Sequence, residues 1–369
     1  MDSARRTGPL HWECAIAGDT NPEGRNRSAI WFWFELRGVA GRRVTIDLTA
    51  LRGEWNFQSS IGWGPATRPV FGGDGHWRRF RDDEVEWDGT PDAERLRLTF
   101  EVPIIDRVAL AYIEPYTYGD HQHFIDGLRA NPSAGVTHHV VGRSPEQRRI
   151  DLVTIGSGSI DGTDGVVWLI HRQHPWETYS SFAAEAAILH LIENEEARRG
   201  LTWQIVPMVN PDGCFHGHTR HNTLGKDPNR EWKQAAPTPE VACVRAAITA
   251  KLGGEPVFFA DVHNNDQRSN DYLMLTSAPH IKDVAGAEAL VALVARRLAS
   301  GSHFSGTTRP PPAPAPGAAH AGKPFSFPSA LLEMRTGPLP TRNGAYGTIE
   351  DQRRLGVALV DAIGAALTQ

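Results

Sequence analysis

The chain has 369 residues, of which 40% are hydrophobic and 22% are charged, and this ordinary globular composition excludes a mainly disordered protein. Lys and Arg number 38 against 43 Asp and Glu, which gives a formal net charge of −5. Since the chain also has no long basic run, it lacks the charge pattern that binding to a phosphate backbone requires. The length suggests about two domains, and no nucleic acid partner is expected.

The three cysteines, Cys14, Cys214 and Cys243, are widely spaced and fit neither a disulfide framework nor a cysteine-based zinc site. The first residues contain no apolar segment of signal-peptide length, and no run of about 18 apolar residues follows. We therefore predict a cytoplasmic protein with no membrane partner. The sequence does not indicate an oligomeric state.

Residues 1–118 are expected to form an all-β domain. Short β-rich runs separated by Gly, Pro, Asp and Asn occupy 30–36, 44–48, 96–102 and 107–113. Apolar and polar residues alternate in RRVTIDLTAL and RLRLTFEV, so one face of each strand is buried and the other solvated. This pattern predicts an antiparallel β-sandwich.

Residues 119–369 are expected to form an α/β domain with a mixed, mostly parallel sheet flanked by helices. Apolar strands at 166–171, 203–209, 257–263, 271–277 and 329–335 alternate with helical stretches at 181–199, 240–251, 286–300 and 348–367. The Pro-rich stretch 307–323 predicts a long loop, which is either a solvated excursion or a flap over an active site.

His174 and Glu177 follow an apolar strand directly, at the position where open α/β sheets place ligands. The same His-x-x-Glu spacing recurs in His190 and Glu193, but that pair lies inside a predicted helix, and we interpret its side chains as solvated or ion-paired on an exposed face. His263 ends another strand. Two histidines and one carboxylate form the usual open coordination of a hydrolytic zinc, although a buried, hydrogen-bonded histidine is the alternative.

Glu333 stands in the otherwise apolar strand SALLEMR, where a carboxylate is costly unless it is paired, metal-linked or catalytic. Beside a zinc ion it could take a proton from water and return it to a leaving amine, and a salt bridge to Arg335 is the alternative. Asp261, two residues before His263, could orient that ligand or support the sheet edge.

A loop rich in turn formers carries Arg220 and the doublet Asn229–Arg230. One guanidinium could bind a carboxylate with two parallel hydrogen bonds, and another could stabilise the oxyanion that forms when water attacks an amide. The alternative is that these arginines bond only loop carbonyls and surface acids.

Together these motifs resemble the zinc carboxypeptidases of the carboxypeptidase A superfamily, specifically the cytosolic carboxypeptidase branch. The similar segments are HPWETYSS, VNPDG with the later DPNREW, ADVH and LLEM, in the order that the family has. The first part of the chain is similar to the same branch in WFWFELRGVAGRRVTIDL and AYIEPYTYGDHQHFIDGL, so the resemblance covers nearly the whole chain.

The resemblance implies one zinc ion per chain, held by His174, Glu177 and His263. It also implies that Glu333 activates the water and protonates the leaving amine, while Arg220 polarises the scissile carbonyl.

By the same resemblance, Asn229 and Arg230 bind the terminal carboxylate of a peptide or protein tail, which makes the protein an exopeptidase. Release of glutamate is a weaker implication. Family members with that specificity carry a basic residue before the catalytic-glutamate strand, where this chain offers only His320 and Lys323.

The chain departs from the family pattern at two further positions. The tyrosine that closes over the substrate has no obvious counterpart besides Tyr272, and Trp176 replaces the usual Gly between the first two ligands. The prediction is a cytoplasmic metallocarboxypeptidase. The alternatives are a cytoplasmic peptidase for γ-D-Glu muropeptides and an inactive zinc-dependent module that binds C-terminal tails.

Overall fold

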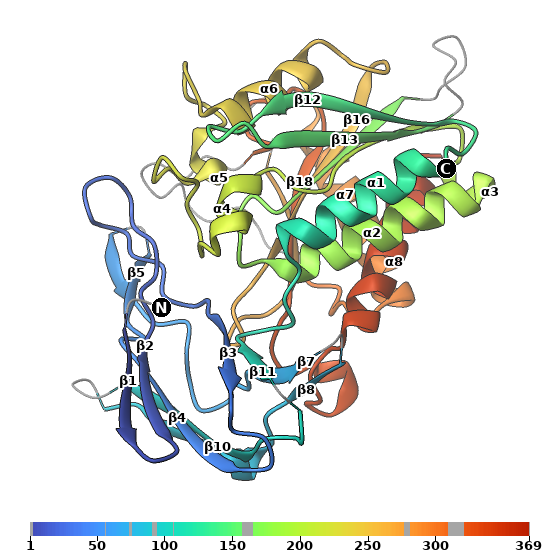
Figure 1. Ribbon diagram of the computed structural model, residues 1–369. Coiled ribbons are helices and arrows are strands. Elements are labelled where there is room, and N and C mark those ends of the chain that lie inside the picture. Colours follow the sequence, from blue (N-terminus) through green and yellow to red (C-terminus); the bar gives the residue numbers. More distant parts are fainter. Residues whose placement is uncertain are drawn as a thin grey trace.

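The computed structural model describes residues 3–55, 57–73, 76–90, 94–105, 107–156, 165–276, 281–308 and 321–368. It consists of an N-terminal pair of β-sheets and a larger α/β part, which lie against each other (Figure 1). Within the described ranges, no helix is both long and apolar enough to cross a bilayer. Most of the predicted Pro-rich loop, with His320, lies outside the described residues.

The N-terminal part contains the predicted sandwich. One sheet has the strand order β1-β2-β4-β10-β9, with the bounds Ser3–Gly8, His11–Ala15, Arg43–Thr49, Arg95–Glu101 and Val85–Asp88. The other has the order β3-β11-β7-β8, with the bounds Trp33–Arg37, Arg107–Ala111, Val70–Gly73 and His76–Arg79. All neighbours are antiparallel except β2 and β4.

The alternation in the sequence explains how the two sheets pack. Along β10, Leu96, Leu98 and Phe100 are buried while the residues between them are partly exposed. Phe100 meets Phe71 of the other sheet with 4.7 Å between ring centroids. A short hairpin of β5 (Gly53–Trp55) and β6 (Gln58–Ser60) and the 3-10 helix η1 (Asp82–Glu84) complete this part.

The α/β part is built on one sheet with the strand order β12-β13-β15-β14-β16-β18-β17. The bounds in that order are Val136–Arg143, Arg149–Ile155, Thr202–Val206, Val166–His171, Pro256–Asn264, Ser329–Met334 and Tyr272–Leu275. The four central strands β15, β14, β16 and β18 are parallel, and the outer pairings are antiparallel. The predicted mixed sheet is thus confirmed, with its parallel strands at the centre.

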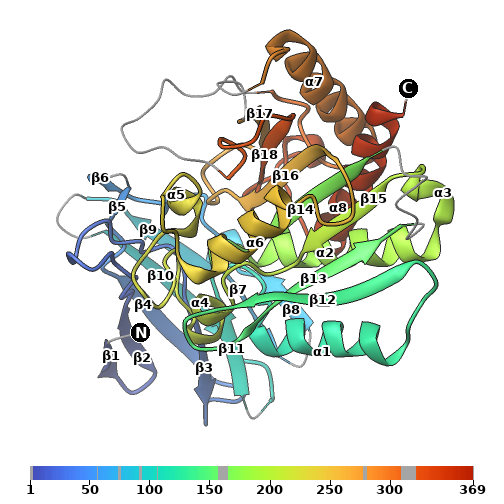
Figure 2. The same cartoon turned by 90° about the horizontal axis from the view of Figure 1, so that it is seen from above.

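Helices cover both faces of this sheet (Figure 2). The helices are α1 Tyr118–Ala130, α2 Thr178–Glu193, α3 Glu195–Arg198, α4 Pro211–His216, α5 Pro228–Glu231, α6 Pro239–Thr249, α7 Val284–Gly301 and α8 Ile349–Leu367, with the 3-10 helix η2 at Pro340–Arg342. Apolar side chains of α2, α7 and α8 belong to the core on one face, and those of α6 to the core on the other.

The core on the α2 and α8 face continues into the sandwich, because one cluster of buried apolar side chains contains residues of both parts. The last sandwich strand ends at Ala111 and α1 begins at Tyr118. The division into 1–118 and 119–369 stays a prediction, since a shared core joins the two stretches.

Candidate functional site

The candidate site lies where the central parallel strands end. His174 and Glu177 follow β14, Arg220, Asn229 and Arg230 follow β15, His263 lies at the end of β16 and Glu333 at the end of β18. Because neighbouring parallel strands end at one edge of the sheet, segments far apart in sequence meet there. The structure thus brings the seven predicted residues into one region.

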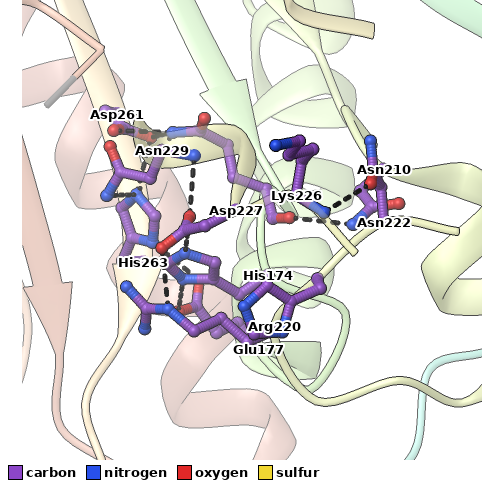
Figure 3. Close-up of polar contacts among 12 residues, drawn as sticks. His174, Glu177, Asn210, Arg220, Asn222, Lys226, Asp227, Asn229, Asp261 and His263 are labelled. Carbon is purple, nitrogen blue, oxygen red and sulfur yellow. Dashed lines mark hydrogen bonds and ion pairs between the residues drawn. The ribbon is translucent and has the colours of Figure 1, made fainter. Parts of the chain in front are cut away.

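His174, Glu177 and His263 form a compact buried group (Figure 3). His174 Nδ1 lies 2.6 Å from one carboxylate oxygen of Glu177, and His263 Nδ1 lies 2.9 Å from the other. One ligand atom from each residue lies within 4.8 Å of the others, so the three could hold a metal ion. Within the described residues, this is the group of His, Cys, Asp and Glu side chains with that geometry.

The outer nitrogens of both imidazoles face carboxylates. His174 Nε2 lies 3.1 Å from Asp227 Oδ1, and His263 Nε2 lies 2.9 Å from Asp261 Oδ1. Burial alone lowers the pKa of His263, but the negative charges of Asp261 and Glu177 raise it well above its usual value. Carboxylates behind the imidazoles and Nδ1 atoms converging in front are the arrangement expected for histidine ligands of a zinc ion, so the residues present fit that group.

Local backbone geometry explains how the chain turns sharply after β14. Arg172 adopts a left-handed conformation with φ 55°, which is unusual for a residue with a side chain. Its buried guanidinium donates hydrogen bonds to the carbonyls of Tyr116 and Pro175 and to the Ser181 hydroxyl. A strained residue fixed by several bonds at this position orients the segment that carries His174 and Glu177.

Glu333 lies in β18 beside both neighbouring strands of the site. It is in register with His263 of β16 and with Tyr272 of β17. Burial, together with the negative charges of Glu177 and Asp261, raises its pKa above the usual range although the charge of His263 opposes this. The alternative salt bridge between Glu333 and Arg335 is not present among the described residues, where Arg335 Nη1 donates to Asn270 Oδ1 at 2.5 Å and Glu333 Oε2 has no partner.

Arg220, Asn229 and Arg230 line the same cavity. Arg220 Nε donates to Asp227 Oδ2 at 2.8 Å. Within the described residues, Arg230 Nη1, Asn229 Oδ1 and Glu333 Oε2 are buried without a hydrogen-bond partner. Burial lowers the pKa of Arg230. Unpartnered buried groups are rare in folded proteins, and their concentration in one cavity indicates a place for a ligand.

The cavity has a volume of about 570 Å³ and lies between the two parts of the molecule. Its walls include His174, Glu177 and Glu333 on one side and the sandwich residues Ser28, Gly53 and Trp55 on the other. Trp176 also lines the cavity, is 4% exposed, and packs its ring edge-on against Tyr112 of the sandwich. The space that Trp176 takes up is therefore used for the contact between the two parts.

Tyr272 lines this cavity too. Although it lies in a strand, it reaches the site because β17 pairs with β18 beside Glu333. The pKa of Lys323 is lowered, first by burial and then by the positive charges of Lys233 and Arg230, so these three side chains lie near one another.

The second His-x-x-Glu pair takes no part in the site. His190 Nε2 lies 3.0 Å from Asp361 on α8 and Glu193 is exposed, so one side chain is ion-paired and the other lies at the surface, as the sequence indicates. Sequence analysis missed Asp227 and Gln173. Gln173 donates to Asp261 at 2.8 Å and accepts from Trp232 at 2.8 Å. Their nearness in sequence to Asn229 and His174 was the available signal.

Comparisons with known proteins agree with this arrangement. Residues 121–270 match the family model described as zinc carboxypeptidase, a stretch that includes all the predicted site residues except Glu333. Human cytosolic carboxypeptidase 6 is 30% identical over 213 residues, covering 53% of this chain and 42% of that protein. A Zymomonas mobilis protein is 29% identical over 245 residues, covering 64% of this chain and 58% of that protein. The chain therefore spans about half the length of these curated relatives.

Solved structures show the same fold over nearly the whole chain. A metallo-carboxypeptidase from Burkholderia cenocepacia has a TM-score of 0.82 at 24% identity, covering 98% of this chain and 94% of that chain. A Pseudomonas aeruginosa metallo-carboxypeptidase in complex with (2-guanidinoethylmercapto)succinic acid has a TM-score of 0.80 at 23% identity, covering 98% and 94%. These findings agree with the family predicted from the motifs, since residues 121–270 match the zinc carboxypeptidase model and cytosolic carboxypeptidase 6 is similar over half of this chain.

Proposed function

We propose that the protein is a metallocarboxypeptidase with one zinc ion, which hydrolyses the last peptide or isopeptide bond of a peptide or protein tail. The observation that carries this proposal is one cavity lined by His174, Glu177 and Glu333 together with the unpartnered groups of Asn229 and Arg230. This single cavity therefore combines a metal site, a proton acceptor and an anion-binding site.

The substrate's terminal carboxylate is bound by Arg230 and Asn229. Among the described residues, Nη1 of the buried Arg230 guanidinium has no hydrogen-bond partner, and this favours an anionic ligand because an ion pair compensates for lost hydration. Every peptide offers a carboxylate at its C-terminal end, whereas an internal residue offers one only where its side chain is acidic. This binding mode therefore favours removal of single C-terminal residues.

The reacting groups are supplied by Glu333 and Arg220. When bound by His174, Glu177 and His263, zinc supplies Lewis acidity, which lowers the pKa of a water molecule and polarises a carbonyl. Glu333 takes the proton of the attacking water and passes it to the leaving amine nitrogen as the carbon–nitrogen bond breaks. Arg220 donates hydrogen bonds to the carbonyl oxygen while negative charge develops there.

A preference for an acidic terminal residue is proposed from the family resemblance. Lys233 and Lys323 lie near Arg230 but do not line the cavity, so their charges act on the site only from outside it. Release of glutamate is the form of this preference that the family resemblance suggests. A cytoplasmic location stays the prediction made from the sequence.

The test is mass spectrometry of peptides incubated with the purified, zinc-loaded chain. The panel varies the C-terminal residue and includes polyglutamate, branched γ-Glu tails and a D-Glu-containing muropeptide, with Glu333→Gln as control. We expect stepwise loss of single C-terminal residues by the wild type alone. Cleavage of the muropeptide only would establish the muropeptide peptidase, and tail binding without any product, unchanged in Glu333→Gln, would establish the inactive module.

A further inference from the structure

A carboxylate of the sandwich is bound by three consecutive backbone amides of the loop that carries Arg220. Asp19 Oδ1 accepts a hydrogen bond from Thr219 N at 2.6 Å, and Oδ2 accepts from Arg220 N at 3.0 Å and from His221 N at 2.6 Å. His221 Nδ1 lies 2.7 Å from the same Oδ2. Successive amides that converge on one anion form a concave anion-binding nest, which a residue of the other part of the molecule fills here.

This contact is well shielded from solvent. The side chains of Asp19 and His221 are 12% and 2% exposed. Burial tends to raise the pKa of Asp19, but the bonds and charge of His221 and the amides of the nest lower it below its usual value. Asp19 therefore acts as a carboxylate, which binds amides more strongly than a neutral group does.

The backbone on the sandwich side is fixed as well. Asp19 and Ser28 form a small antiparallel bridge, in which Ser28 N donates to Asp19 O at 2.9 Å. Gly18 precedes it with φ +68°, and a Cβ there would lie 2.2 Å from the Ser28 carbonyl oxygen. Asp19 is thus presented by a tight turn that only glycine allows at this position.

The loop on the other side leads to the metal-binding group. From the backbone held by Asp19, the Arg220 side chain reaches Asp227 at 2.8 Å, and Asp227 reaches His174 at 3.1 Å. Arg220 lines the cavity of the candidate site, whereas Asp19 does not. Asp19 can therefore influence the reacting groups through the orientation of Arg220, without contacting a substrate.

We propose that Asp19 is a positioning residue for Arg220, so that the sandwich is a working part of the active site. This inference rests on the proposed function for its kinetic consequence. Its structural part, the locking of residues 219–221 by Asp19, is independent of that function.

Hydrogen exchange of the zinc-loaded chain tests the structural part. In Asp19→Asn, an NH2 group replaces one of the two accepting oxygens and faces backbone N–H groups to which it cannot bond, so the amides of 219–221 should exchange at least about tenfold faster than in the wild type. The strand β15 should exchange at an unchanged rate. Unchanged exchange at 219–221 in both Asp19→Asn and Asp19→Ala would overturn the proposal.

Kinetics with a double-mutant cycle tests the consequence. We expect Asp19→Asn to lower kcat roughly 10- to 100-fold with KM changed less than about threefold, because small displacements of a reacting group have large effects. In an Arg220→Ala background the same change should lower kcat by less than about twofold further, since its effect passes through Arg220. Equal losses in both backgrounds would overturn the proposal.

Asp47→Asn is the matched control. Asp47 is another buried sandwich aspartate paired with a histidine, since His11 Nε2 lies 2.8 Å away, but it does not line the candidate site. This variant should leave kcat unchanged at temperatures where it is folded. If the wild type cleaves no peptide while the exchange result holds, the proposed function fails and the structural role of Asp19 stands.

Discussion

Asp227 joins a candidate metal ligand to a candidate reacting group. Its Oδ1 lies 3.1 Å from His174 Nε2, and its Oδ2 accepts a hydrogen bond from Arg220 Nε at 2.8 Å. Burial tends to raise the pKa of Asp227, but the charges of Arg220, Arg230 and His174 hold it well below its usual value. One ionised carboxylate therefore orients two functional side chains.

We predict that Asp227→Asn weakens zinc binding about 10- to 100-fold, which is the usual effect of removing a carboxylate that orients a histidine ligand. The measurement is competition for zinc with a chelator of known affinity. Asp361→Asn is the control, because Asp361 also bonds a histidine, His190, at 3.0 Å, outside the site. Equal zinc affinity of the wild type and Asp227→Asn would show that Asp227 does not support the ligand.

Replacing Glu333 by Gln should lower kcat about 10²- to 10⁴-fold, because the amide cannot accept the proton of the attacking water. Zinc content, measured by elemental analysis after dialysis, should stay at one equivalent. Turnover within tenfold of the wild type would remove Glu333 from the mechanism.

The same variant should stabilise the metal-free protein. Since burial raises the pKa of Glu333 in the folded state, folding opposes its ionisation, and this cost appears as the pH rises above the unfolded pKa. In the presence of a chelator, Tm of Glu333→Gln should exceed that of the wild type, by more at pH 8 than at pH 5. A lower Tm at both pH values would contradict the raised pKa.

Sequence analysis predicted the residues of the site but not the contacts that support them. Strand alternation and the strand-end positions of His174, Glu177, His263 and Glu333 are local signals, and four parallel strands necessarily bring their ends together. By contrast, Asp19 meets Thr219 across 200 residues, and no local pattern connects them.

Two elements that sequence analysis did not predict, α1 and β12, have weak hydrophobic patterns. In α1 only His121 and Ile125 are buried, so no apolar stripe indicates a helix. The outer strand β12 is partly or fully exposed along its whole length. Both elements are stabilised by tertiary contacts, such as those of His121 and His138 with Asp151 at 3.1 and 2.7 Å.

The ionisation of Asp47 should make the stability of the sandwich depend on pH. Burial tends to raise its pKa, but hydrogen bonds from Arg97 and His11 lower it below the usual value. A lowered pKa contributes stability that is present above the unfolded pKa and lost as the pH falls through the folded pKa. Asp47→Asn should therefore be less stable than the wild type by about 1–2 kcal/mol at pH 7.

The difference in the free energy of unfolding between Asp47→Asn and the wild type should shrink as the pH falls from about 5 to 3, because the wild-type carboxyl is then protonated. Chemical denaturation at several pH values measures it. A difference that stays constant over this range would show that the loss comes from packing and not from the charge of Asp47.

The exposed aromatic side chain of the β5–β6 hairpin should contact the substrate upstream of the scissile bond. Trp55 lines the cavity from the sandwich side and is 55% exposed, so its ring is available to a peptide that leaves the site along this wall. We predict that Trp55→Ala raises KM about 3- to 10-fold for long peptides, the range expected for one aromatic contact, and leaves kcat unchanged.

An acylated dipeptide, which ends before reaching Trp55, should show no change in KM on the same substitution. Phe57→Ala is the control, since Phe57 is 60% exposed on the same hairpin but does not line the cavity. Equal increases in KM for the dipeptide and the long peptide would show that Trp55 affects the site itself and does not contact the upstream part of the substrate.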